Sequence, residues 1–115
     1  MAIAVTRTRL PGGRHVAEAA LLSDQEATTD GEWIPISGVR PFTVHVTGID
    51  SATVDLRASG AEEKPANNVA GEIVGSAKTA NGMWNLDQAT FKWLKCRVTV
   101  YASGTINAWF HGEQA

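Results

Sequence analysis

Residues 91–110, FKWLKCRVTVYASGTINAWF, decide the fold of this chain. Apolar side chains occupy positions 94, 96, 98 and 100, whereas Lys, Arg and Thr occupy the positions between them. This period of two is typical of a strand with one buried face. A second apolar run follows Ser103 and Gly104, which are residue types that favour turns. The stretch therefore predicts a long β-hairpin around which the rest of the chain packs.

The register of this hairpin depends on the length of its loop. A two-residue loop at Ser103 and Gly104 would set Val98 opposite Trp109 and mix apolar with polar partners. A three-residue loop over residues 102–104 keeps apolar partners together and puts Gly104 at the left-handed position of a bulged turn. Because a slip of one residue turns every apolar side chain towards water, burial favours the three-residue loop. The expected pairs, buried on one shared face, are Val100 with Ile106, Val98 with Ala108 and Cys96 with Phe110.

The composition indicates one small domain. A chain of 115 residues can bury roughly two-thirds of its unfolded surface, so it needs neither metal nor disulfide to fold. The 10 basic and 12 acidic residues give a formal net charge of -2 without a run of Lys and Arg, which argues against nucleic acid as a partner. No stretch approaches the ~20 apolar residues of a membrane span, and the arginines among residues 1–10 argue against a signal peptide. We therefore expect a soluble protein from a reducing compartment, with its one thiol, Cys96, buried as a small hydrophobe.

The N-terminal part predicts an extended arm. Residues 2–10 read as a first strand with Ile3 and Val5 on one side, and the Pro-Gly-Gly at 11–13 reads as a turn. Residues 14–22 are ambiguous, because Ala and Leu favour a helix while the same apolar positions would also serve one face of a strand. We favour an extended arm or edge strand, because the segments that follow are strand-like.

The middle of the chain predicts short strands at close spacing. Residues 32–37, 40–47 and 52–59 are strand-like runs separated by glycine-containing turns. Residues 60–70 have almost nothing to bury and should form an exposed loop. Residues 71–86 surround an Asn-Gly pair, which is typical of a hairpin turn and predicts a second hairpin.

These segments together predict an all-β fold. We expect an antiparallel β-sandwich or jelly-roll-like barrel of about seven to eight short strands with an extended N-terminal arm. The chain is divided into residues 1–30, the arm and first strand, and residues 31–115, the β-sandwich core of what is a single domain.

No combination of residues predicts catalysis or a cofactor. His15, His45 and His111 lie on separate segments without the short spacing of a zinc site. Glu62 and Glu63 lie in an expected flexible loop and cannot hold the fixed carboxylate separation that glycoside hydrolysis requires. The sequence has no phosphate loop, dinucleotide fingerprint or nucleophile elbow. We therefore expect no enzyme, no catalytic residue, no metal and no cofactor.

The tryptophans are better candidates for function than the histidines. In the expected register, several aromatic side chains and one arginine share the outward face of the hairpin. Such a face is either covered by a second layer, and so ordinary core, or it is a contact surface, because Trp, Tyr and Arg dominate the energetics of interfaces. The candidate interface residues are Trp93, Arg97, Tyr101, Trp109, Trp84, Ile3 and Val5.

Four segments of the sequence carry a family resemblance. They are GEWIPISG at 31–38, FTVHVTG at 42–48, ATVDLRAS at 52–59 and WLKCRVTVYASGTINAW at 93–109. In this order they resemble small β-sandwich structural proteins of tailed bacteriophage virions, which decorate or cement capsids or serve as head and tail accessory parts. The similarity covers residues 31–112 and is a pattern rather than a diagnostic motif.

The resemblance implies a virion structural protein, made in the cytoplasm of a host bacterium. We expect a capsid cement or decoration protein that stabilises the shell through contacts between subunits. Its expected partners are further copies of itself, as a trimer, and the major capsid protein or another virion protein. The alternative is a carbohydrate- or receptor-binding module of a tail fibre or other tail accessory protein, with Trp84, Trp93 or Trp109 as stacking platforms.

Overall fold

The computed structural model describes residues 3–87 and 91–114 and shows an all-β fold. The described residues form no helix, and their strands pair antiparallel, which confirms the predicted fold class. The strands are β1 (Thr6–Arg9), β2 (His15–Gln25), β3 (Ile34–Pro35), β4 (Val39–Ser59), β5 (Glu72–Ile73), β6 (Gly82–Leu86) and β7 (Trp93–Gln114).

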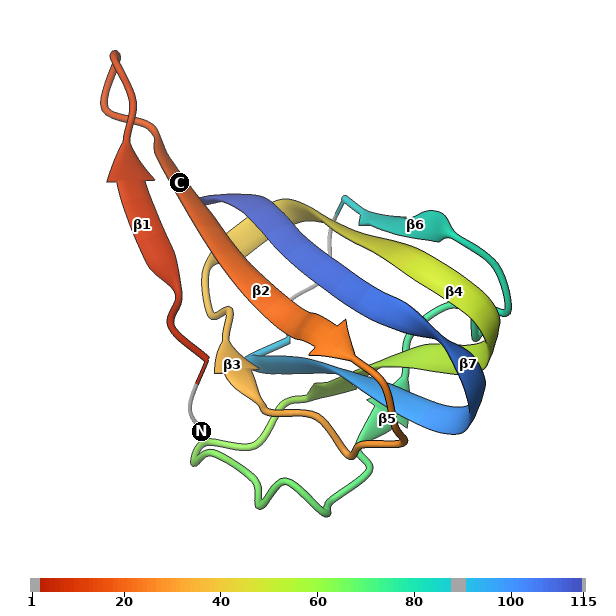
Figure 1. Ribbon diagram of the computed structural model, residues 1–115. Coiled ribbons are helices and arrows are strands. Elements are labelled where there is room, and N and C mark those ends of the chain that lie inside the picture. Colours follow the sequence, from red (N-terminus) through yellow and green to blue (C-terminus); the bar gives the residue numbers. More distant parts are fainter. Residues whose placement is uncertain (1–2, 88–90, 115) are drawn as a thin grey trace.

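The long strands β4 and β7 form the frame of the molecule. They pair with each other from Val39 opposite Gln114 to Ser59 opposite Trp93. The two-stranded ribbon bends back on itself, so that its two halves stack as two layers (Figure 1). The first layer has the strand order β1-β2-β7-β4-β6, and the second layer has the order β3-β7-β4-β5. The buried apolar side chains lie mainly between these layers.

Two glycines allow the ribbon to bend. Gly48 of β4 and Gly104 of β7 have φ angles of 80° and 121°, which glycine adopts at little steric cost. A Cβ atom on Gly48 would lie 1.7 Å from the carbonyl oxygen of Thr105, and a Cβ atom on Gly104 would lie 2.5 Å from the carbonyl oxygen of Gly48. The two backbones therefore touch at the bend, where any side chain would force them apart.

The predicted hairpin over residues 91–110 is wrong, because β7 continues through this stretch as one strand. Its two halves pair with β4 and not with each other; Val98, for example, lies opposite Val54. The two runs predicted as separate strands within residues 40–59 are likewise both part of β4. The second predicted hairpin, within residues 71–86, is also wrong, because β5 and β6 each pair with β4.

Burial of the predicted apolar face is confirmed at every position except Val100. Val100 is 59% exposed, because Thr53 pairs with Val100 while the next residue, Val54, pairs with Val98. The extra residue on β7, Thr99, is a β-bulge that reverses the alternation of the strand. The buried positions are Cys96, Val98, Ile106, Ala108 and Phe110.

Strand β2 belongs to the core and not to an arm. It pairs with β7 from His15 opposite Gln114 to Gln25 opposite Ile106. Its buried side chains are Val16, Ala17, Ala19, Leu21 and Leu22. The strand predicted as one alternative for residues 14–22 is therefore confirmed, whereas the predicted arm is corrected for this segment, because the apolar residues of β2 complete the first layer. β1 is the edge strand of the first layer, and the turn that follows it extends beyond the sheet (Figure 1).

Residues 60–70 form an exposed loop, as predicted, but the backbone of this loop is anchored to the second layer. Trp33 donates a hydrogen bond from Nε1 to the carbonyl of Ala66 (3.1 Å). Trp93 donates from Nε1 to the carbonyl of Ala61 (3.0 Å). The loop therefore covers part of the outer face of the second layer.

Candidate functional site

The bend of the β4–β7 ribbon divides the predicted aromatic face between the two layers. Trp93 and Arg97 lie on the second-layer half of β7, whereas Trp109 lies on its first-layer half. The outer faces of two stacked layers point away from each other, so these residues do not form one surface. Tyr101 lies near the bend, where its hydroxyl donates a hydrogen bond to the carbonyl of Gly104 (2.6 Å).

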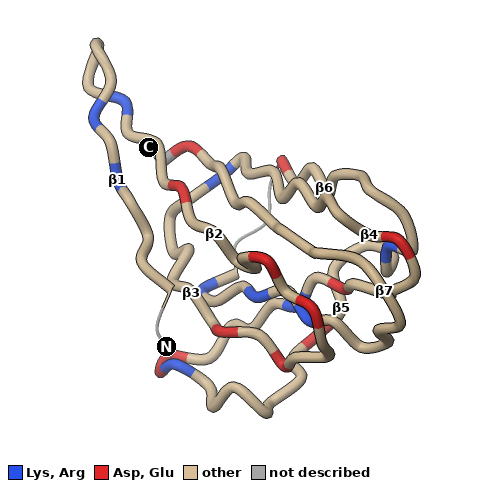
Figure 2. Tube along the Cα trace, in the orientation of Figure 1, with Lys and Arg blue, Asp and Glu red and all other residues tan. Residues whose placement is uncertain are grey.

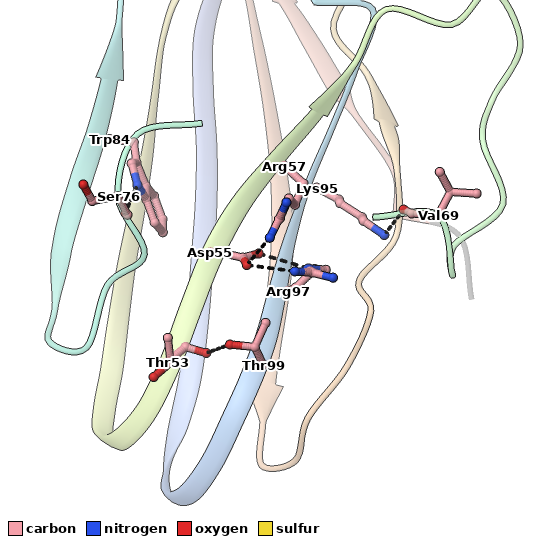
Figure 3. Close-up of polar contacts among 9 residues, drawn as sticks. All are labelled: Thr53, Asp55, Arg57, Val69, Ser76, Trp84, Lys95, Arg97 and Thr99. Carbon is pink, nitrogen blue, oxygen red and sulfur yellow. Dashed lines mark hydrogen bonds and ion pairs between the residues drawn. The ribbon is translucent and has the colours of Figure 1, made fainter. Parts of the chain in front are cut away.

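Arg97 is engaged in a partly buried ion cluster around the buried Asp55 (Figure 3). The Asp55 carboxylate accepts hydrogen bonds from Arg97 Nε (3.1 Å), Arg97 Nη2 (3.0 Å) and Arg57 Nη2 (3.1 Å). Burial raises the pKa of Asp55, but the hydrogen bonds from both arginines outweigh burial and hold this pKa below its ordinary value. The cluster fastens β4 to β7 in the second layer, so Arg97 has a structural role.

Lys95 is completely buried, although its position in the strand alternation predicts an outward side chain. Its Nζ donates hydrogen bonds to the carbonyls of Asn67 (2.7 Å) and Val69 (2.8 Å), and it lies 4.6 Å from the centre of the Trp33 ring. Burial lowers the pKa of this amine. Figure 3 shows the side chain reaching towards the loop at Val69. The outer face of the second layer is thus partly covered by the loop of the same chain.

Trp84 is a core residue rather than a contact residue. It is 5% exposed, and its Nε1 donates a hydrogen bond to the carbonyl of Ser76 (2.9 Å; Figure 3). The ammonium group of Lys78 lies 5.6 Å from the centre of its ring. Trp84 is therefore enclosed by its own chain.

An open groove of about 610 Å³ runs along the outer edge of β2. It arises because β1 pairs with β2 only as far as Thr6 opposite Glu18, and the preceding residues diverge from β2. Ile3 and Trp109 both line the groove, and Trp109 is 49% exposed. The structure therefore brings together two of the predicted interface residues. A third, Val5, is half-buried against the core.

A projecting basic hairpin is the second surface of interest. We define the basic hairpin as residues 6–15, which contain Arg7, Arg9 and Arg14 and no acidic residue. All four residues of β1 are exposed, and Arg14 forms an ion pair with Glu113 (2.9 Å). Figure 2 shows these basic residues on the part of the chain that extends from the sandwich. The Thr-Arg-Thr-Arg sequence before the Pro-Gly-Gly turn is the signal that could have identified this hairpin.

The histidines and the cysteine are not brought together. His45 and His15 lie on different strands, and His111 Nδ1 lies 3.7 Å from Glu18 Oε2. Within the described residues, no group of three or more His, Cys, Asp and Glu side chains could hold a metal ion. Cys96 is fully buried, and burial raises the pKa of its thiol. Residues 3–87 and 91–114 contain no helix that is long and apolar enough to cross a membrane.

The comparisons with known proteins identify one similar fold. No family model and no curated protein matches the chain. The crystal structure of the SPBc2 prophage-derived protein YomS matches with a TM-score of 0.68 and 16% sequence identity, covering 93% of this chain and 100% of that chain. This likeness shows a shared fold. The crystal structure of Drosophila melanogaster CENP-C bound to CAL1 matches with a TM-score of only 0.34 and 8% identity, over 96% of this chain and 76% of that chain, and carries no weight.

Proposed function

We propose that this chain is a structural protein of a bacteriophage particle that acts as a capsid cement or decoration protein. The resemblance of its sequence to virion structural proteins supports a phage origin, and so does the likeness of its fold to a prophage-derived protein. Its proposed partners are further copies of itself, as a trimer, and the major capsid protein or another virion protein. It would be made in the bacterial cytoplasm and end in the virion.

The projecting basic hairpin is the observation that carries this proposal. Its strand β1 is exposed at all four residues and forms the edge of the first layer, and the turn that follows β1 extends beyond the sheet (Figure 1). β1 is the edge strand of the first layer, because β2 has β7 on its other side, so the outer edge of β1 is open to pairing with a partner surface. A protein that cements a shell must reach across to neighbouring subunits, and stable contacts of this kind bury ~800 Å² or more per partner.

Binding to undecorated capsids tests the proposal. The purified protein should sediment with the capsids and reach saturation. Arg9→Glu should weaken this binding at least tenfold, because it reverses a charge on the exposed face of the hairpin. Lys92→Glu is the matched control, since Lys92 is also exposed but lies outside the hairpin, and it should bind like the parent. A parent protein without affinity for capsids would overturn the proposal.

The second candidate function is a carbohydrate- or receptor-binding module of a phage tail. Trp109 favours it, because this side chain is half-exposed at the groove and could stack against a sugar ring. Trp84 is excluded as a platform by its burial, and the indole N–H of Trp93 is engaged with Ala61. Glycan-array binding that is lost in Trp109→Ala would favour this candidate over the cement protein.

A further inference from the structure

Opposite charges are concentrated at the two ends of strand β2. The basic hairpin, at its start, carries three arginines and no acidic residue, and Arg14 is paired with Glu113 of the same molecule. Residues 24–32 begin at the last two residues of β2 and continue beyond it. They form an acidic segment without Lys or Arg. Its acidic residues are Asp24, Glu26, Asp30 and Glu32. Figure 2 shows the two groups of charges at separate places along the chain.

The two charged regions cannot neutralise each other within one molecule. Arg7 and Arg9 lie opposite Ala17 and His15 of β2, so at the rise of an extended strand they lie roughly 23–30 Å from Asp24 along the strand. This separation is about two to three times the Debye length at 0.1 M salt. Attraction between the basic hairpin and an acidic segment can therefore act only between different molecules.

The acidic segment is held in a defined position. Asp24 has a φ angle of 47°, and its backbone amide donates a hydrogen bond to Asn107 Oδ1 (2.9 Å). Thr29 and Val98 exchange two backbone hydrogen bonds of 3.1 Å. Glu32 is paired with Lys64, whereas none of the ion pairs found in the described residues involves Asp24 or Glu26. These two carboxylates are exposed and remain available to a cation from outside.

We infer that the basic hairpin of one copy docks head to tail on the acidic segment of a second copy, beside the groove along β2. Glu18, Gln25 and Glu32 line that groove and add negative charge and hydrogen-bond acceptors to it. β1 ends the strand order of the sheet, and β2 has no β1 partner beyond Glu18. Both surfaces therefore offer backbone groups for pairing of strands between copies, while the charges fix which surfaces meet.

A head-to-tail contact has consequences for assembly. The two surfaces differ and lie at opposite ends of β2, so each copy can use both at once. Contacts of this type close into a ring or extend into a chain. The inference rests on the proposed function only in taking a second copy as partner. It is tested without capsids, so its failure is distinguishable from a failure of capsid binding.

The mass of the protein in solution tests the inference. At roughly 50 mM salt, light scattering should give a multiple of the one-chain mass of 12.2 kDa, and the mass should fall at roughly 500 mM salt as charges are screened. Arg9→Glu and Glu26→Lys should each reduce the mass to one chain. Lys92→Glu and Glu63→Lys alter exposed charges elsewhere by the same amounts and should leave it unchanged. Circular dichroism should show that all four variants are folded.

Mixing identifies the orientation of the contact. Arg9→Glu and Glu26→Lys proteins in equal amounts should regain at least the mass of a dimer, because each reversed surface then meets its complement. A parent protein that stays at one-chain mass at low salt would overturn the inference. An oligomer that dissociates in only one of the two variants, or a mixture that stays monomeric, would also overturn it, because the contact would then not join hairpin to acidic segment.

Discussion

Replacing Lys95 with methionine should loosen the loop of residues 60–70 and leave the sandwich folded. Lys95 is 0% exposed, and its ammonium group satisfies the carbonyls of Asn67 and Val69 over the face of Trp33. Methionine fills nearly the same space as the lysine stem, so the substitution removes the charge and its hydrogen bonds without creating a large cavity.

Opposing terms set the size of the effect. Hydrogen bonds to a charged group contribute about 1.5–3 kcal/mol each, and a partly buried cation–π contact adds about 0.5–2 kcal/mol. Removal of a buried charge offsets part of this loss, because desolvation of an ion costs several kcal/mol. Asn67 and Val69 are exposed, so water can reach their carbonyls once the amine is gone. We therefore expect a net loss of about 1–3 kcal/mol in the free energy of unfolding.

Two measurements check this expectation. Urea melts should show a lower free energy of unfolding for Lys95→Met than for the parent. Hydrogen exchange in residues 60–70 should be faster in the variant than in the parent, with a smaller change in the amides of β4 and β7. Lys92→Met is the matched control, because Lys92 is exposed and should change stability by less than about 0.5 kcal/mol. If Lys95→Met is as stable as the parent and the loop exchanges no faster, the amine does not anchor the loop.

Three further predictions concern the core and the ion cluster. Phe110→Ala should cost ~3–5 kcal/mol in urea melts, because Phe110 is 0% exposed and its ring lies 5.4 Å from that of Phe42; a parent-like melt would show that the site is not core. Cys96 should react with a thiol reagent only at the rate of unfolding, since it is buried with a raised pKa; rapid labelling of the native protein would contradict this. The depressed pKa of Asp55 means that its carboxylate stabilises the fold above its ordinary pKa of about 3.9, and that this stability is lost as pH falls through the lower folded value. Asp55→Asn should therefore be less stable at pH 7, with a smaller loss on acidification below about pH 4; an acid dependence equal to that of the parent would refute this role.

The alternation of side chains predicted most of the buried positions of β7, with Val100 and Lys95 as exceptions, but not which strands pair. Cys96, Val98 and Phe110 face the core as expected, because alternation depends only on one strand having a buried face. A hairpin turn and the bend of a long strand both use glycine, and Gly104 serves the bend. Whether Gly104 marks a hairpin turn or a bend depends on which strand pairs with β7. That strand is β4, and its matching Gly48 lies more than fifty residues before Gly104.

The covering of the second layer could not be predicted from residue types. Residues 60–70 are polar, as expected of an exposed loop, and their side chains are indeed mostly exposed. The loop is anchored through its backbone carbonyls, which accept hydrogen bonds from Trp and Lys side chains. Every residue has such a carbonyl, so a sequence pattern does not reveal this role. For the same reason Lys95, a charged residue on an expected outer face, gave no sign of its burial.

The arginines of β1 have a second physical explanation, which the charge-reversal experiment separates from docking. Charged residues on an edge strand prevent pairing with other molecules, and Arg7 and Arg9 lie on such an edge. A charge of either sign blocks an edge, so Arg9→Glu would leave a monomer monomeric if blocking were its only role. Docking depends on the sign, because only a positive hairpin complements the carboxylates of Asp24 and Glu26 on another copy. The recovery of mass on mixing two variants that are each monomeric can therefore come from complementary docking and not from edge protection.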